Sequence, residues 1–199
     1  MLSFKDLYKM ALPQVRLNHS LRILLTLNTT MTLIIGVFMP FYAIYVIKLG
    51  GDIAFVGMSW ALFHLVCGIL TLFFTKWSLR VREQELLLAL GYIIRAVVFL
   101  SYAFMTSLTQ LLLTQVLWGI AIAIGVPAFD SIYSAHTTNE DSIGQWGGYE
   151  GITSIAVGIS ALVGGFAIEA FGFVPLFYVM TAVHLMLAAY IWRLPREVL

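Results

Sequence analysis

Charged residues are scarce in this chain. Of its 199 residues, 11% are Asp, Glu, Lys or Arg, whereas 61% are hydrophobic, and the formal net charge is +1. A soluble domain of this composition would leave large apolar surfaces in water. The nearly neutral charge balance also argues against a nucleic-acid partner, which requires a basic surface. The sequence therefore predicts a protein whose solvent is the lipid bilayer.

Common catalytic signatures are also missing. Cys67 is the only cysteine, so the sequence offers neither a disulfide framework nor a thiolate metal cluster. The four histidines share no ligand spacing, and there is no Gly-rich phosphate loop, nucleophile elbow or His-Glu-x-x-His pattern. We therefore expect no cofactor, no metal site, no coupling to ATP and no enzymatic activity.

Six apolar stretches fill most of the chain, each with the roughly 20 residues that a helical membrane crossing needs. Helices are expected because backbone polar groups in hydrocarbon must be satisfied within the segment unless a barrel closes, and these stretches lack the alternation of barrel strands. Pro40 and Pro127 are expected to kink the first and fourth stretches. The predicted fold is an all-α membrane domain over residues 21–193, with spans at about 21–47, 53–74, 86–105, 108–134, 144–171 and 173–192.

Positive charge gathers on one side of the predicted membrane. Nine Lys and Arg residues flank the spans on the side of the termini, and only Lys48 flanks them on the other. The positive-inside rule then places both termini in the cytoplasm, in what we expect to be a bacterial inner membrane. The nine residues are Lys5, Lys9, Arg16, Arg22, Lys76, Arg80, Arg82, Arg193 and Arg196.

The two ends of the chain are expected to stay outside the hydrocarbon. The first apolar run is too long for a signal peptide, so residues 1–20 are expected to remain as a cytoplasmic or interfacial segment. Within it, residues 4–9 alternate apolar and basic side chains, which fits either a short amphipathic helix on the inner leaflet or a disordered lead-in. Residues 194–199 are expected to form a cytoplasmic tail.

Ionisable residues at membrane depth carry the main functional signal, because they are costly and face a protein interior or water. Arg95 lies about 11 residues into the third span, or ~16 Å deep. Asp130 and Glu150, in the fourth and fifth spans, are its natural partners. Two interpretations stay open: a fixed ion pair that ties helices together, or an acid that binds and releases a proton during transport.

Other polar side chains in the spans fit either a cavity lining or ordinary helix packing. Asn28, Thr32 and Tyr42 share one helical face of the first span, and Trp60 and His64 share a face of the second. Tyr92 lies one turn from Arg95 on the same face of the third span. These six residues are the cavity candidates.

The fifth span carries a continuous face of small side chains. Such a face lets another helix approach closely, since helix association in lipid depends on packing. The face either packs inside the six-helix unit or contacts a partner unit, and its length favours the partner. We call it the small-residue stripe; its members are Gly147, Gly151, Ser154, Gly158, Ala161 and Gly165.

Short motifs follow the six spans in a recognisable order. Leu49-Gly50-Gly51-Asp52 forms the first joint, and Gly68 precedes the basic second joint, where Phe74 and Thr75 stand in place of the usual acid. Gly119 and Pro127 mark the fourth span, and Gly158, Gly164-Gly165 and Phe171-Gly172-Phe173 mark the fifth and its turn, without the fifth-helix proline. In this order the chain resembles one six-helix half of the major facilitator superfamily of secondary transporters.

The resemblance implies a function and a partner. Transporters of this family hold their substrate between two parallel six-helix halves near the membrane midplane. Two copies of this chain would rebuild such a transporter, with the second and fifth helices at the partner, the first and fourth lining the cavity, and the third and sixth outermost. We therefore expect a parallel homodimer that moves a small solute by alternating access, with proton coupling through Asp130, Glu150 or His64. The alternatives are a non-transporting membrane scaffold or accessory protein, and a half that pairs with a different half.

Overall fold

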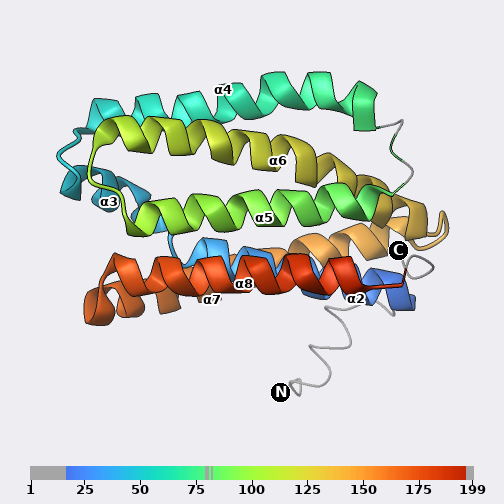
Figure 1. Ribbon diagram of the computed structural model, residues 1–199. Coiled ribbons are helices and arrows are strands. Elements are labelled where there is room, and N and C mark those ends of the chain that lie inside the picture. Colours follow the sequence, from blue (N-terminus) through green and yellow to red (C-terminus); the bar gives the residue numbers. More distant parts are fainter. Residues whose placement is uncertain (1–16, 79–80, 82, 196–199) are drawn as a thin grey trace, which may run out of the picture.

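The computed structural model describes residues 17–78, 81 and 83–195 of the chain, and this part is helical throughout, without strands (Figure 1). Six segments are long and apolar enough to cross a membrane, which confirms the predicted fold class. The elements are α2 (His19–Gly36), the 3-10 turn η1 (Met39–Phe41), α3 (Tyr42–Lys48), α4 (Ile53–Ser78), α5 (Gln84–Ala103), α6 (Leu108–His136), α7 (Ser142–Phe171) and α8 (Phe173–Arg193).

The first span is broken, whereas the fourth is not. Helix α2 ends at Gly36, Pro40 lies in η1, and helical structure resumes in α3 at Tyr42. Proline removes a backbone donor and clashes with the preceding turn, so an interruption at Pro40 is expected. Pro127 lies inside α6, which stays helical through it. The first span therefore consists of two helices, α2 and α3, separated by the residues around Phe38 and the turn η1.

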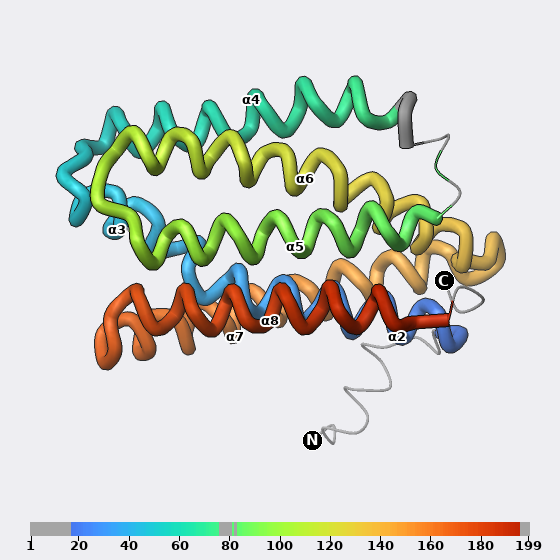
Figure 2. The backbone as a smooth tube through the Cα atoms, in the orientation of Figure 1, coloured from blue at the N-terminus to red at the C-terminus, as the bar shows by residue number. Residues whose placement is uncertain are grey.

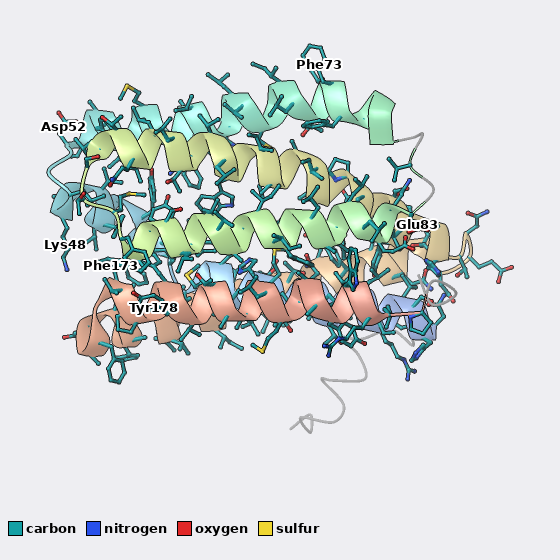
Figure 3. The ribbon with its side chains drawn as sticks, viewed as in Figure 1. Lys48, Asp52, Phe73, Glu83, Phe173 and Tyr178 are labelled. Carbon is teal, nitrogen blue, oxygen red and sulfur yellow. The ribbon has the colours of Figure 1, made fainter. Side chains whose placement is uncertain are left out.

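The joints between helices alternate between the two ends of the bundle. Short turns join α3 to α4, α5 to α6 and α7 to α8 at one end, where Lys48 and Asp52 lie, and Glu83 marks the other end (Figure 3). The first and last described residues lie at the end that contains Glu83 (Figure 1). Of the predicted basic cluster, Arg22 and Arg193 lie within the described helices at that end. The predicted interfacial helix over residues 4–9 and most of the basic joint at 79–82 lie outside the described residues.

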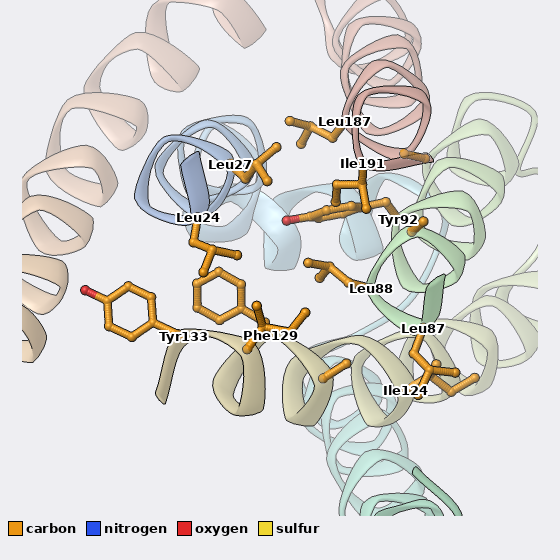
Figure 4. Packing of buried hydrophobic residues seen from close by; sticks show 14 of the residues in the cluster. Leu24, Leu27, Leu87, Leu88, Tyr92, Ile124, Phe129, Tyr133, Leu187 and Ile191 are labelled. Atoms are coloured by element: carbon orange, nitrogen blue, oxygen red, sulfur yellow. The ribbon is translucent and has the colours of Figure 1, made fainter. Parts of the chain in front are cut away.

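The helices pack in a defined order. Helix α4 lies against α6, α6 against α5, α5 against α8, and α2 against α7 (Figure 2). One core cluster of aliphatic and aromatic side chains, including Leu24, Leu88 and Phe129, fills the space between α2, α5, α6 and α8 (Figure 4). A second cluster surrounds Phe38, whose ring lies 5.0 Å from that of Phe177 and 5.3 Å from that of Tyr102. Phe38 therefore fixes the break of the first span onto α5 and α8.

Two helices are much less covered than the others. In the most apolar stretch of each span, 11% of the residues of α4 and 17% of those of α7 are buried inside the unit, compared with 33–56% in the other four spans. The difference arises because α4 contacts mainly α6, and α7 contacts mainly α2. These helices are the second and fifth spans, so the two helices that the family resemblance assigns to a partner are the two most available for one.

Helices α2 and α7 approach each other so closely that only small residues fit between them. A Cβ at Gly164 would overlap the backbone carbonyl of Val37, and a Cβ at Gly36 would overlap the hydroxyl of Ser160. Van der Waals contact at such sites is a main source of helix association in lipid. The inner face of α7 is therefore formed by Ser160 and Gly164, together with Ala156, which is also buried.

We predict that Gly164→Ala destabilises the protein by about 1–3 kcal/mol, because overpacking forces the two backbones apart. The matched control is Gly158→Ala in the same helix, where an added Cβ meets nothing within 4 Å. The control should be neutral or slightly stabilising, since alanine is the better helix former. Thermal or denaturant unfolding in detergent measures both; equal stabilities of the two variants would contradict the α2–α7 contact.

Candidate functional site

Arg95 is buried in the centre of the unit, and no acidic residue of the described part of the chain forms an ion pair with it. Its side chain is 1% exposed, and one terminal nitrogen donates to Met31 Sδ at 3.4 Å. The guanidinium carbon lies 5.3 Å from the centre of the Tyr92 ring, and Nε has no hydrogen-bond partner among the described residues. A thioether sulfur is a weak hydrogen-bond acceptor. The cation–π interaction with an aromatic face is likewise a weak replacement for a carboxylate. The positive charge of Arg95 is therefore poorly satisfied in this conformation.

A small cavity adjoins the Arg95 guanidinium. Its volume is about 40 Å³, and it is enclosed by α2, α5, α6 and α7. Gly125 widens it, because a Cβ there would lie 3.6 Å from the Arg95 nitrogen Nη2. The cavity brings together four of the predicted site residues, Asn28, Tyr92, Arg95 and Asp130. The remaining lining residues are Met31, Leu88, Val126, Phe129, Tyr149 and Gly125.

The predicted ion pair of Arg95 with Asp130 or Glu150 is not formed in the described part of the chain. Asp130 lines the same cavity as Arg95, but its side chain lies largely uncovered by the unit. Glu150 on α7 is also exposed, and the two carboxylates interact with each other electrostatically. Arg95 instead points inward under Met31 and Tyr92. Both acids are therefore exposed on the surface of the unit, whereas Arg95 is buried inside it.

The other predicted cavity residues take different positions. Asn28 is buried and donates to Thr153 Oγ1 at 3.2 Å, which joins α2 to α7. Thr32 is half-buried and does not line the cavity. Trp60 and His64 are exposed on α4, with ring centres 5.0 Å apart. The α4 pair is therefore exposed and does not line the Arg95 cavity.

A second polar cluster, centred on Gln115, was not predicted. Gln115 is fully buried and donates to the hydroxyls of Tyr42 at 2.6 Å and Tyr102 at 3.0 Å. Tyr42 also shares a hydrogen bond of 2.7 Å with Ser59, and Tyr45 donates to the Tyr102 carbonyl at 2.7 Å. The cluster links α3, α4, α5 and α6. A glutamine inside the apolar run 111–117 is the sequence signal for it, since an amide at membrane depth requires partners.

The small-residue stripe of α7 lies mostly on the outside of the unit. A Cβ at Gly147, Gly151 or Gly158 would meet nothing within 4 Å, and Ser154 is exposed. Ala161 is half-buried, and Gly165 contacts the Phe41 ring. The stripe is therefore distinct from the buried face that packs on α2, and most of it is free within the described unit.

Six helices long and apolar enough to cross a membrane, with buried polar clusters between them, define the class of this protein as a multi-pass membrane protein. The Major Facilitator Superfamily profile matches residues 24–198, and the chain belongs to this family, as its motifs predicted. No curated protein matches the chain. Family members are transporters of small solutes within the membrane, which makes transport the expected activity of this domain.

We predict that Gln115→Leu lowers the free energy of unfolding by about 1–3 kcal/mol, since it removes two side-chain hydrogen bonds worth roughly 0.6–1.7 kcal/mol each in a membrane protein. A double-mutant cycle with Tyr102→Phe should show that the two losses are not additive. Tyr178→Phe, which removes an exposed hydroxyl on α8, is the matched control and should add independently. Additive losses for the Tyr102 pair would contradict the cluster.

Proposed function

We propose that this chain is one half of an alternating-access transporter for a small solute, with the second half supplied by a parallel copy of the chain. The observation that carries the proposal is the exposure of α4 and α7 on a unit whose other helices are well packed. Both helices expose large apolar side chains, such as Leu72 of α4 and Leu162 of α7, together with small ones such as Gly158. A partner of the same kind would cover both.

The size of the internal cavity supports a solute site between halves. At about 40 Å³ the cavity beside Arg95 has room for a few water molecules at most. Ligand pockets are about ten times larger. Within the described residues, this cavity is therefore too small for a solute, whereas two units facing each other would enclose further space between them. Asp130, Glu150, Trp60 and His64 are exposed on the single unit and would be available to line that space.

The small-residue stripe suits the contact between the two copies. Gly147, Gly151 and Gly158 leave the α7 backbone open to a close approach, which is how helices associate in lipid. Parallel association requires both copies to insert in one orientation. The excess of basic residues on the side of the termini favours that orientation, with both ends in the cytoplasm.

The charge arrangement supports proton coupling. Asp130 lines the cavity beside the Arg95 guanidinium without forming an ion pair with it, so the proposal gives the carboxylate two states. In one state Asp130 carries a proton and stays apart from Arg95. In the other the carboxylate releases the proton and pairs with Arg95. Exchange between these states would link proton movement to closure of the cavity.

We predict that Gly158→Cys, in a Cys67→Ser background, forms a disulfide between two copies in native membranes, because the proposed dimer has the stripe on its two-fold axis, where a residue meets its own equivalent. Ala182→Cys, exposed on α8, is the control and should form no disulfide between copies. Gly158→Leu and Ser154→Leu should insert normally yet elute as monomers from mild detergent, since neither residue packs inside the unit.

The outcomes separate the alternatives. Cross-linking to a different six-helix protein would replace the homodimer by a heterodimer of halves. A wild-type chain that stays a stable monomer in a native-like bilayer, without cross-links at Gly158 or Ser154, would contradict the two-half transporter and favour a scaffold.

A further prediction concerns the acid in the charge arrangement. Infrared titration of the reconstituted protein should show a carboxyl band that appears and disappears with pH, and Asp130→Asn should remove it. The control is Glu169→Gln, which removes an exposed carboxylate on α7 and should leave this band unchanged. A titrating band that persists in Asp130→Asn would exclude Asp130 as the proton carrier.

A further inference from the structure

A groove runs along the outer face of α2, on the side away from the Arg95 cavity. Its volume is about 450 Å³, and it lies between α2 and α8 at the end of the bundle that carries the first and last described residues. Leu27 of α2 and Leu187 of α8 lie next to each other along it (Figure 4). A second apolar groove of about 240 Å³ continues it past Thr30, between α2 and α7. Neither groove belongs to the site described above.

The mouth of the first groove is positively charged and rich in hydrogen-bond donors. His19 and Arg22 lie on one side of it and Tyr190 on the other. Arg22 uses Nε to donate to the Leu17 carbonyl at 3.1 Å, which holds the side chain in place. Within the described residues, its terminal nitrogens have no acceptor, and neither His19 nor the Tyr190 hydroxyl has a partner. Three side chains with hydrogen-bond donors, those of His19, Arg22 and Tyr190, therefore line this end of the groove.

The walls of this groove are apolar despite their threonines. Thr26 donates its hydroxyl to the Arg22 carbonyl and Thr30 donates to the Thr26 carbonyl, both at 2.8 Å. Both hydroxyls are thus satisfied by the α2 backbone, and the remaining wall residues are Ile23, Leu27 and Leu187. From His19 to Thr30 the helix rises ~16 Å. This length matches one leaflet of a hydrocarbon core ~30 Å thick.

We propose that this groove binds an anionic phospholipid, with its phosphate at Arg22, His19 and Tyr190 and an acyl chain along the α2–α8 walls. Charge at one end only and an apolar wall one leaflet deep are the features of a lipid molecule. A second copy of the chain is a poor occupant, because a parallel copy brings the same basic end, with Arg22 and Arg193, to this place. The site is independent of the proposed transport function.

Native mass spectrometry of the detergent-purified full chain tests the site, with dioleoyl phosphatidylglycerol and dioleoyl phosphatidylcholine as competing probes. The wild type should retain phosphatidylglycerol preferentially. Arg22→Gln should lower that preference about five-fold, the factor expected for one basic residue near an anionic surface. Arg193→Gln, which removes an exposed charge at the same end but outside this groove, should leave the preference nearly unchanged.

A second variant tests whether the lipid's acyl chain binds in the groove or whether charge alone attracts the lipid. Thr26→Trp fills the groove and keeps Arg22 and His19, so it should reduce retention of both lipids, whereas Ala182→Trp on an exposed face of α8 should not. Equal retention of the two lipids by the wild type, or equal effects of Arg22→Gln and Arg193→Gln, would overturn the proposal. The proposal would also be overturned if Thr26→Trp dissociated the dimer but retained lipid as the wild type does. The groove would then bind a second copy of the chain.

Discussion

Close approach of helix backbones is the constraint on which this structure depends. In lipid, apolar side chains gain nothing from leaving the solvent, so helices associate through van der Waals contact and hydrogen bonds. Glycine makes that contact possible at three interfaces: Gly91 meets Gly125 between α5 and α6, Gly119 meets the α4 backbone, and Gly164 meets Val37 between α7 and α2. The extensive α5–α8 interface is instead packed by larger side chains, such as Phe99 and Phe177.

The two polar clusters differ in how well their groups are satisfied. Around Gln115, the hydroxyls of Tyr42 and Tyr102 accept hydrogen bonds from the amide nitrogen, and four elements are joined, although Gln115 Oε1 has no hydrogen-bond partner among the described residues. Around Arg95, a full positive charge meets a thioether, a ring face and a small cavity. An unpaired buried charge costs more than an unpaired amide oxygen, and it favours any rearrangement that brings an acceptor. The region around Arg95 therefore gains more from rearrangement than the region around Gln115.

The sequence predicted the architecture well because membrane length and helical periodicity are strong signals. The six spans, the interruption at Pro40 and the burial of Arg95 at mid-depth followed from such signals. The partner of Arg95 did not, because spacing along each helix gives depth but leaves the rotation of α6 and α7 open. Asp130 has the depth of a partner and lines the cavity beside Arg95, yet it forms no ion pair with it among the described residues. Gln115 was missed because a single amide in a leucine-rich run does not alter the apolar character of the span.

The face of α7 that packs inside the unit was equally hard to predict. Small residues occur around nearly the whole helix, so the pattern Gly147 to Gly165 and the pattern Ala156, Ser160 and Gly164 compete on sequence alone. The structure separates them by the position of α2. Contact with the Val37 backbone distinguishes Gly164, which packs on α2, from the glycines of α7 that lie open.

One joint has mechanical consequences. Gly172, with φ at 78°, is the single residue between α7 and α8, and its backbone N–H still bonds to the Ile168 carbonyl. A 30-residue rod and a 21-residue rod are thus linked without slack. The C-terminal end of α7 and the N-terminal end of α8 must therefore move together. Because α8 packs along α5, a displacement of this joint is felt by the helix that carries Arg95.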